Sequence, residues 1–111
     1  MAFDRYEVVT ALFPFTDVEI RKPRPALVLS GASFNMEHRH LVASMITTGA
    51  RSRWPSDHDI ADLASTGLAH PSVVRWKVFT LPFTIIGRRI GALSRADREA
   101  VEIKVRAILG G

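Results

Sequence analysis

The chain has 111 residues, 47% hydrophobic and 23% charged, so it is long enough to bury one core, and we expect a single domain over residues 1–111. It has no cysteine, which excludes disulfides, zinc–thiolate sites and a thiol nucleophile. The net charge is +4 and 12 of the 15 basic residues are arginine, which favours an anionic partner with phosphate or carboxylate groups.

Membrane and secretion signals are missing from the sequence. No apolar run approaches the ~20 residues of a membrane span, and the first seven residues contain no apolar signal core. We therefore expect a cytoplasmic protein that does not bind membranes, in agreement with the lack of cysteine.

The predicted elements are mostly short strands. Residues 7–13 form an apolar, β-branched strand that Pro14 ends. Residues 26–30 are a continuous apolar run, typical of a strand covered on both faces. Further strands are predicted at residues 41–47, 58–60 and 72–81, a weaker segment at 84–86, and loops at 33–39, 49–57 and 65–71.

The last segment has the pattern of a helix. Ser94 is a suitable N-cap with Asp97 three residues later, and Gly110 suits the C-terminal end. One apolar stripe for packing on the core comprises Val101, Val105, Ile108 and Leu109. The sequence thus predicts a mainly β fold with a C-terminal helix, in which a small antiparallel sheet curls or closes into a barrel.

Arg24 stands out because it lies between Pro23 and Pro25, directly before a predicted core strand. Each proline fixes its own φ, and Pro25 also forces Arg24 into an extended conformation. This backbone is stiffer than a charge that only contacts solvent requires.

Two other features accompany Arg24, a pair of threonines and a second arginine. Thr47 and Thr48 end a predicted strand, and Arg75 lies on a later one. If the strands close into a barrel, their ends converge on one groove with arginines to hold a phosphate and hydroxyls to orient it. Trp76 alternates with Arg75 and Lys77 along its strand, so an inward Trp76 places both basic residues on the outer surface.

Other kinds of chemistry have little support. The spacings of His38, His40 and His58 match no zinc motif, and we predict neither a metal site nor a cofactor. The chain has no glycine-rich phosphate loop and no GxSxG motif. Arg88 and Arg89 either contact a phosphate or lie in a solvated turn, and we favour the turn.

Several motifs resemble those of one family, the PemK/MazF-like toxins of bacterial toxin–antitoxin systems. The segments that carry the resemblance are FPFTD at residues 13–17, RPALVLS at 24–30, ITT at 46–48, PSVVR at 71–75, FTL at 79–81 and RRIG at 88–91. They are spread over nearly the whole chain.

The resemblance implies a small SH3-like barrel of the MazF/CcdB type, a homodimer, and sequence-selective, metal-independent cleavage of single-stranded RNA by attack of the ribose 2′-hydroxyl. It assigns catalysis to Arg24 and Thr47, with a contribution from Arg75. It also implies a cognate antitoxin whose acidic, partly disordered tail folds across the groove. The residues that we expect to bind RNA are Phe15, Thr16, Thr48, Arg51, Arg53, Trp54 and Lys77.

The sequence departs from the family pattern at the residue two positions after Arg75. Lys77 stands where some members have an aspartate proposed as the acid or base. Two alternatives therefore stay open: a non-nucleolytic toxin of the same fold that poisons DNA gyrase, and a plain interaction domain in which Arg24 is a rigid surface charge.

Overall fold

The computed structural model describes residues 2–13 and 22–110. The elements in this part of the chain are β1 (Glu7–Ala11), β2 (Arg24–Val28), α1 (Ala32–His38), β3 (His40–Thr47), β4 (His58–Asp59), the short 3-10 helix η1 (Ala64–Thr66), β5 (Val73–Pro82), the 3-10 helix η2 (Phe83–Ile85), β6 (Ile86–Ala92) and α2 (Arg95–Leu109). No helix within these residues is long and apolar enough to cross a membrane.

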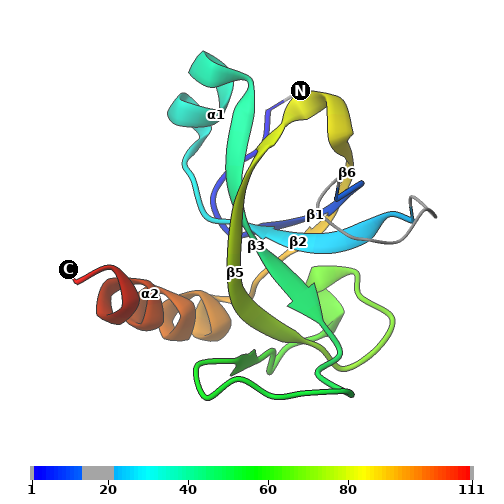
Figure 1. Ribbon diagram of the computed structural model, residues 1–111, viewed down its shortest axis with the longest axis vertical. Helices are drawn as coiled ribbons and strands as arrows, with labels where there is room; N and C mark the ends of the chain where they lie inside the picture. The colour runs from blue at the N-terminus through cyan, green and yellow to red at the C-terminus, as the bar shows by residue number, and fades with distance from the viewer. Residues whose placement is uncertain (1, 14–21, 111) are drawn as a thin grey trace.

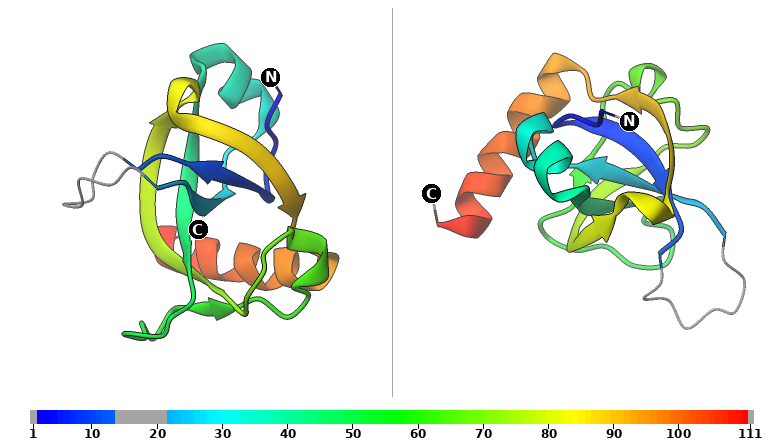
Figure 2. Two further views of the ribbon diagram at one scale, coloured as in Figure 1. Left: turned by 90° about the vertical axis from the view of Figure 1, so that its right-hand side faces the viewer. Right: turned by 90° about the horizontal axis from the view of Figure 1, so that it is seen from above.

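The six strands form one antiparallel sheet in the order β4-β5-β3-β2-β1-β6, and α2 packs beside it (Figure 1). The sheet is strongly curved, as the two further views show (Figure 2). β4 and β6 are its two edges, and within the described residues no strand pairing joins them, so the predicted barrel is open on one side. The mainly β fold with a C-terminal helix is confirmed.

Both faces of the sheet carry a core. In β1, Val8 and Val9 point to opposite faces and are both fully buried. In β2, Leu27 joins the core of Val8, whereas Ala26 and Val28 join that of Val9. The prediction that this run is a strand covered on both faces is therefore confirmed.

α2 begins and ends where the sequence predicts. The Ser94 hydroxyl accepts a hydrogen bond from the Asp97 N–H at 3.3 Å, and Gly110 adopts the left-handed conformation with φ 76°. The predicted apolar stripe is only half correct. Val101 is buried in the core that contains Val8 and Leu27, which we call the second core, and Val105 packs against it. Ile108 and Leu109, however, are 47% and 79% exposed.

Two predictions for the chain between β2 and α2 are wrong. Residues 33–39 were expected to form a loop but mostly belong to α1. Asn35 is the one buried residue of this helix. That amide donates to the carbonyls of Phe3 and Ser30. Arg88 and Arg89 were expected in a turn and instead lie on β6, exposed to solvent.

Candidate functional site

Arg24 and Thr47 lie on neighbouring strands at one end of the sheet. β2 starts at Arg24 and β3 ends at Thr47, and the two strands pair antiparallel with Ala26 opposite Met45. Arg24 and Thr47 each lie two residues beyond that pair, and both line the two hollows at this end of the sheet.

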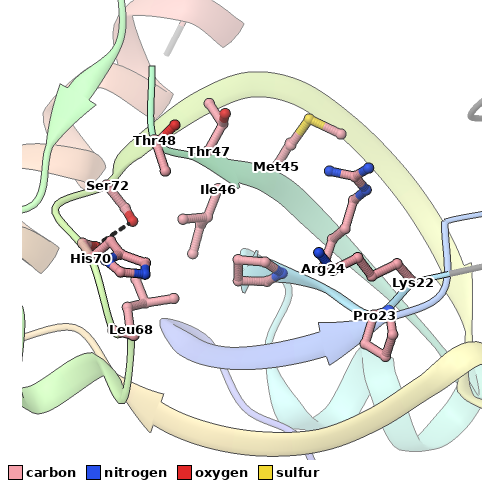
Figure 3. Close-up of a pocket in the computed structure, with 12 residues that line it drawn as sticks. Lys22, Pro23, Arg24, Met45, Ile46, Thr47, Thr48, Leu68, His70 and Ser72 are labelled. Atoms are coloured by element: carbon pink, nitrogen blue, oxygen red, sulfur yellow. Dashed lines mark hydrogen bonds between the residues drawn. The ribbon is translucent and has the colours of Figure 1, made fainter. Parts of the chain in front are cut away.

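Two adjoining hollows flank these residues, and we call them together the groove. The first, of about 430 Å³, is the apolar hollow, and its main lining residues are Pro23, Arg24, Pro25, Met45, Ile46, Thr47, Thr48, Leu68 and His70 (Figure 3). The second, of about 490 Å³, is the polar hollow, lined by Arg24, Thr47, Thr48, Gly49, Ala50, Arg51, Ser52 and Arg75. Arg24, Thr47 and Thr48 are common to both hollows.

The groove is positively charged. Its basic residues are Lys22, Arg24, Arg51 and Arg75, and no acidic side chain lines either hollow within the described residues. The Arg24 side chain is exposed and forms no hydrogen bond or ion pair with another described residue. Its guanidinium therefore projects from a stiff backbone and is available to an anion that enters the groove.

Arg75, in contrast, is held by the protein. Its Nε and Nη2 donate to the two carboxylate oxygens of Asp57 at 3.1 and 2.8 Å, and Nη2 also donates to the Ser52 carbonyl at 2.8 Å. The hydrogen bond from Arg75 lowers the pKa of Asp57, although burial of that carboxylate acts in the opposite direction. Asp57 likewise raises the pKa of Arg75.

A bulge in β5 sets the direction of Arg75. The register of the β3–β5 pair shifts between Ser44 opposite Val78 and Met45 opposite Arg75, which leaves Trp76 and Lys77 as extra residues on β5. The Ser44 hydroxyl donates to the Arg75 carbonyl and fixes the backbone there.

Trp54 lies beside this bulge. The Arg75 guanidinium is 5.4 Å from the centre of the Trp54 ring and the Lys77 ammonium is 5.8 Å from it. Arg75 and Lys77 therefore share one side of β5, whereas Trp76 packs against the second core, as the sequence predicts. Arg75 is nevertheless buried and only Lys77 is exposed.

The structure brings five of the sequence-predicted residues together in the polar hollow, namely Arg24, Thr47, Thr48, Arg51 and Arg75. Trp54 and Lys77 lie next to it through their contacts with Arg75. Arg53 pairs with Asp59 at 2.9 Å and lines neither hollow. Phe15 and Thr16 lie outside the described residues.

Sequence reasoning missed Asp57 and Ser52, the partners of Arg75. Asp57 lies in the predicted 49–57 loop, and no spacing rule connects it to a residue 18 positions later. His58 instead contacts Asp97, with Nε2 and Oδ1 2.8 Å apart. Among the described residues there is no group of three or more histidine and acidic side chains placed to hold a metal ion.

The groove can bind a phosphate chain. The Arg24 guanidinium is open to solvent and the Arg75 guanidinium is fixed at the wall. Thr47 and Thr48 line the same hollow. Guanidinium groups bind phosphate through forked hydrogen bonds, and the neighbouring apolar hollow offers proline, methionine and leucine side chains to a less polar group.

Several solved structures have a similar fold, and three of them come from Deinococcus and mycobacteria. MazF from Deinococcus radiodurans superimposes with a TM-score of 0.78 at 23% identity, covering 100% of this chain and 99% of that one. An endoribonuclease in complex with its cognate antitoxin, from a mycobacterial species, gives 0.75 at 20% identity and covers 98% and 94%. The Mycobacterium tuberculosis toxin MazF-mt6 gives 0.72 at 24%, covering 94% and 96%.

Comparison at the sequence level gives one result for the family and none for individual proteins. No curated protein sequence matches the chain. The family described as PemK-like, MazF-like toxin of type II toxin-antitoxin system matches residues 4–109, which is nearly the full length. The chain therefore belongs to the family of PemK-like and MazF-like toxins.

Proposed function

We propose that this protein is a sequence-selective endoribonuclease toxin that cleaves single-stranded RNA without a metal ion. The observation that carries the proposal is the exposed Arg24 guanidinium, which lies on a proline-flanked backbone beside Thr47 in a groove that no described acidic residue lines. Family membership and the endoribonuclease among the similar structures support the same reaction.

The reaction is an internal transesterification. The ribose 2′-oxygen forms a bond to phosphorus while the bond from phosphorus to the 5′-oxygen breaks, which leaves a 2′,3′-cyclic phosphate and a 5′-hydroxyl. The net change moves one proton from the 2′-oxygen to the 5′-oxygen. Because the substrate supplies its own nucleophile, the protein has to align the attack and stabilise the charge that builds on the phosphoryl oxygens.

The residues predicted to catalyse cleavage or to bind RNA have separate roles in this reaction. Arg24 binds the phosphoryl oxygens through its forked donors, and Thr47 donates a hydrogen bond to the same phosphate. Arg75, whose charge is balanced by Asp57, donates a hydrogen bond from the wall of the polar hollow. Thr48, Arg51, Lys77 and Trp54 bind the flanking nucleotides, Trp54 by stacking on a base. Arg53 contributes to the positive charge around them.

We also propose two protein partners. The first is an antitoxin with an acidic tail that covers the basic groove, by analogy with the mycobacterial endoribonuclease that was solved with its cognate antitoxin. The second is another copy of this chain in a homodimer. We propose the cytoplasm, where its RNA substrate is found, as the place of action.

The test is incubation of the purified protein with a pool of single-stranded RNAs in EDTA, followed by sequencing of the new 5′ ends. We expect cuts at a shared short sequence and a 2′,3′-cyclic phosphate on the upstream fragment. Arg24→Ala, purified identically, controls for contaminating nucleases. Cleavage that needs added Mg²⁺, or that Arg24→Ala retains at the parent's rate, contradicts the proposal.

A further inference from the structure

Asp57 is a buried carboxylate that the proposed reaction leaves without a role. Its side chain is fully buried, and it belongs to the segment that connects β3 to β4. We propose that Asp57 is a positioning residue of the cleavage site, which fixes the Arg75 guanidinium so that one edge of it faces the phosphate in the groove. This inference rests on the proposed function.

The hydrogen bonds of Arg75 leave only one edge free. Nε donates to Asp57 at 3.1 Å, and Nη2 donates to Asp57 and to the Ser52 carbonyl, both at 2.8 Å. Nη1 has only a long contact of 3.4 Å with the Ser52 hydroxyl. Since Arg75 lines the polar hollow with Arg24 and Thr47, Nη1 is the donor left for a ligand there.

Asp57 is itself anchored from three directions. Its carboxylate accepts from the Trp54 N–H at 2.9 Å. The Lys104 ammonium on α2 donates to the carbonyls of Asp57 and Ser56 at 2.8 and 3.2 Å, and the Trp76 indole donates to Ser56 at 2.8 Å. The carboxylate is therefore fixed relative to β5 and α2 and can hold a guanidinium in one orientation.

The ion pair of Arg53 with Asp59, in the same segment, shows how an exposed pair differs from a buried one. Arg53 and Asp59 are 52% and 72% exposed and form an ordinary surface ion pair. The side chains of Arg75 and Asp57 are 9% and 0% exposed. Taking two charges out of water is costly and seldom gains stability over apolar packing, so stability alone is a weak reason for a buried pair at the wall of a groove.

The test compares Asp57→Asn with Glu99→Gln, which also removes one carboxylate from an arginine pair, but on the exposed surface of α2. Three quantities are measured: the single-turnover cleavage rate, the affinity for the same RNA with a 2′-O-methyl group at the cut site, and the salt dependence of that affinity. We expect Asp57→Asn to cleave ~10–100-fold more slowly, since a misplaced group costs rate. It should bind the uncleavable RNA as tightly as the wild type or more tightly.

Tighter binding follows from the released charge. An Arg75 that no longer faces a carboxylate adds one positive charge to the groove, so the salt dependence of RNA binding should steepen by about 0.7 in the log–log slope. Glu99→Gln should match the wild type in all three measurements. A parallel loss of cleavage and binding in Asp57→Asn means a merely structural role and overturns the inference, as does an unchanged cleavage rate.

Two provisions keep the outcome clear. If Asp57→Asn does not fold, Lys104→Met carries the test, because it removes an anchor from the Asp57 backbone and so lets the carboxylate move relative to β5, while every residue that lines the groove is kept. The same split between cleavage and binding is expected, and its absence overturns the inference. A wild type that cleaves no RNA contradicts the proposed function itself, whereas an active wild type with an equally active variant contradicts only the role of Asp57.

Discussion

Arg24 at the start of β2 and Thr47 at the end of β3 line the same two hollows of the surface, from strands that are hydrogen-bonded neighbours. Arg24 is an exposed cation on a backbone stiffened by Pro23 and Pro25. Thr47 is half-buried and offers a neutral hydroxyl. The two residues therefore differ in how much transition-state charge each can stabilise, and substitutions should separate them.

Replacing Arg24 should abolish most cleavage while the fold is kept. Removing one electrostatic donor to a transition state costs ~10²–10³ in rate, so Arg24→Ala should lose that much in single-turnover cleavage. Arg24→Lys keeps the charge but loses the forked donors, and we expect an intermediate rate. Because the side chain is exposed, the melting temperature of both variants should stay close to that of the wild type. Equal rates for Arg24→Lys and the wild type would mean that only charge matters at this position.

Replacing Thr47 tests the hydroxyl alone. Thr47→Val keeps the shape and the β-branched backbone preference but removes the donor, so cleavage should fall by ~10-fold or more with little change in melting temperature. Thr47→Ser keeps the hydroxyl and should retain most of the rate. If the serine and valine variants lose activity equally, the role of Thr47 lies in packing and not in hydrogen bonding.

The fold could be predicted wherever local patterns decided the structure. The apolar run at 26–30 and the caps of α2 at Ser94 and Gly110 are local signals, and the structure confirms the caps and a strand that overlaps the run, at Arg24–Val28. β6 was missed because Gly87 and Gly91 resemble turn residues. In the structure they are sites of close approach, where an added Cβ would lie 2.5 Å from the Thr10 hydroxyl and 2.4 Å from the Thr66 backbone.

The site could be predicted only in part, for a related reason. Arg24, Thr47 and Arg75 were identified from their own residue types and motifs. Whether Arg75 is free or held depends on Asp57, whose approach requires the bulge in β5 and the path of the 48–57 segment. Both are tertiary features, so no pattern in the sequence distinguishes the free guanidinium of Arg24 from the fixed one of Arg75.

RNA binding should depend on salt in proportion to the unpaired charges of the groove. Lys22, Arg24 and Arg51 line it and form no ion pair with another described residue. Each phosphate neutralised on a single strand contributes about −0.7 to the slope of log affinity against log salt, so we expect about −2 per chain.

Arg51→Ala should make this slope shallower by about 0.7, measured by fluorescence anisotropy with an uncleavable RNA. Arg95→Ala is the matched control, because Arg95 is 87% exposed on α2 and lines neither hollow. A slope that changes equally in both variants would indicate that binding follows net charge and not the groove.

The stability of the protein should fall in acid, and Asp97 should account for part of the loss. Its side chain is nearly fully buried, which by itself raises the pKa, but four donors favour the charged form and bring the pKa below its usual value. These donors are the backbone N–H groups of Ala61 and Asp62, the His58 ring and the Ser94 hydroxyl. The pKa of Asp57 is lowered as well.

The sign of the effect follows from proton binding. A carboxyl group with a lowered pKa in the folded state binds fewer protons there than in the unfolded chain. Its contribution to the free energy of unfolding is therefore complete when the pH is above the ordinary pKa of an aspartate, and it is lost as the pH falls below about 4.

Asp97→Asn therefore should lower the free energy of unfolding most at pH 7, and its difference from the wild type should shrink by pH 3. Urea denaturation at a series of pH values measures both curves. Glu99→Gln, which removes a carboxylate that is 65% exposed two residues further along α2, should give a curve parallel to that of the wild type. A constant difference between Asp97→Asn and the wild type from pH 7 to pH 3 would show that the asparagine costs packing or hydrogen bonds alone, and that the charge of Asp97 does not stabilise the fold.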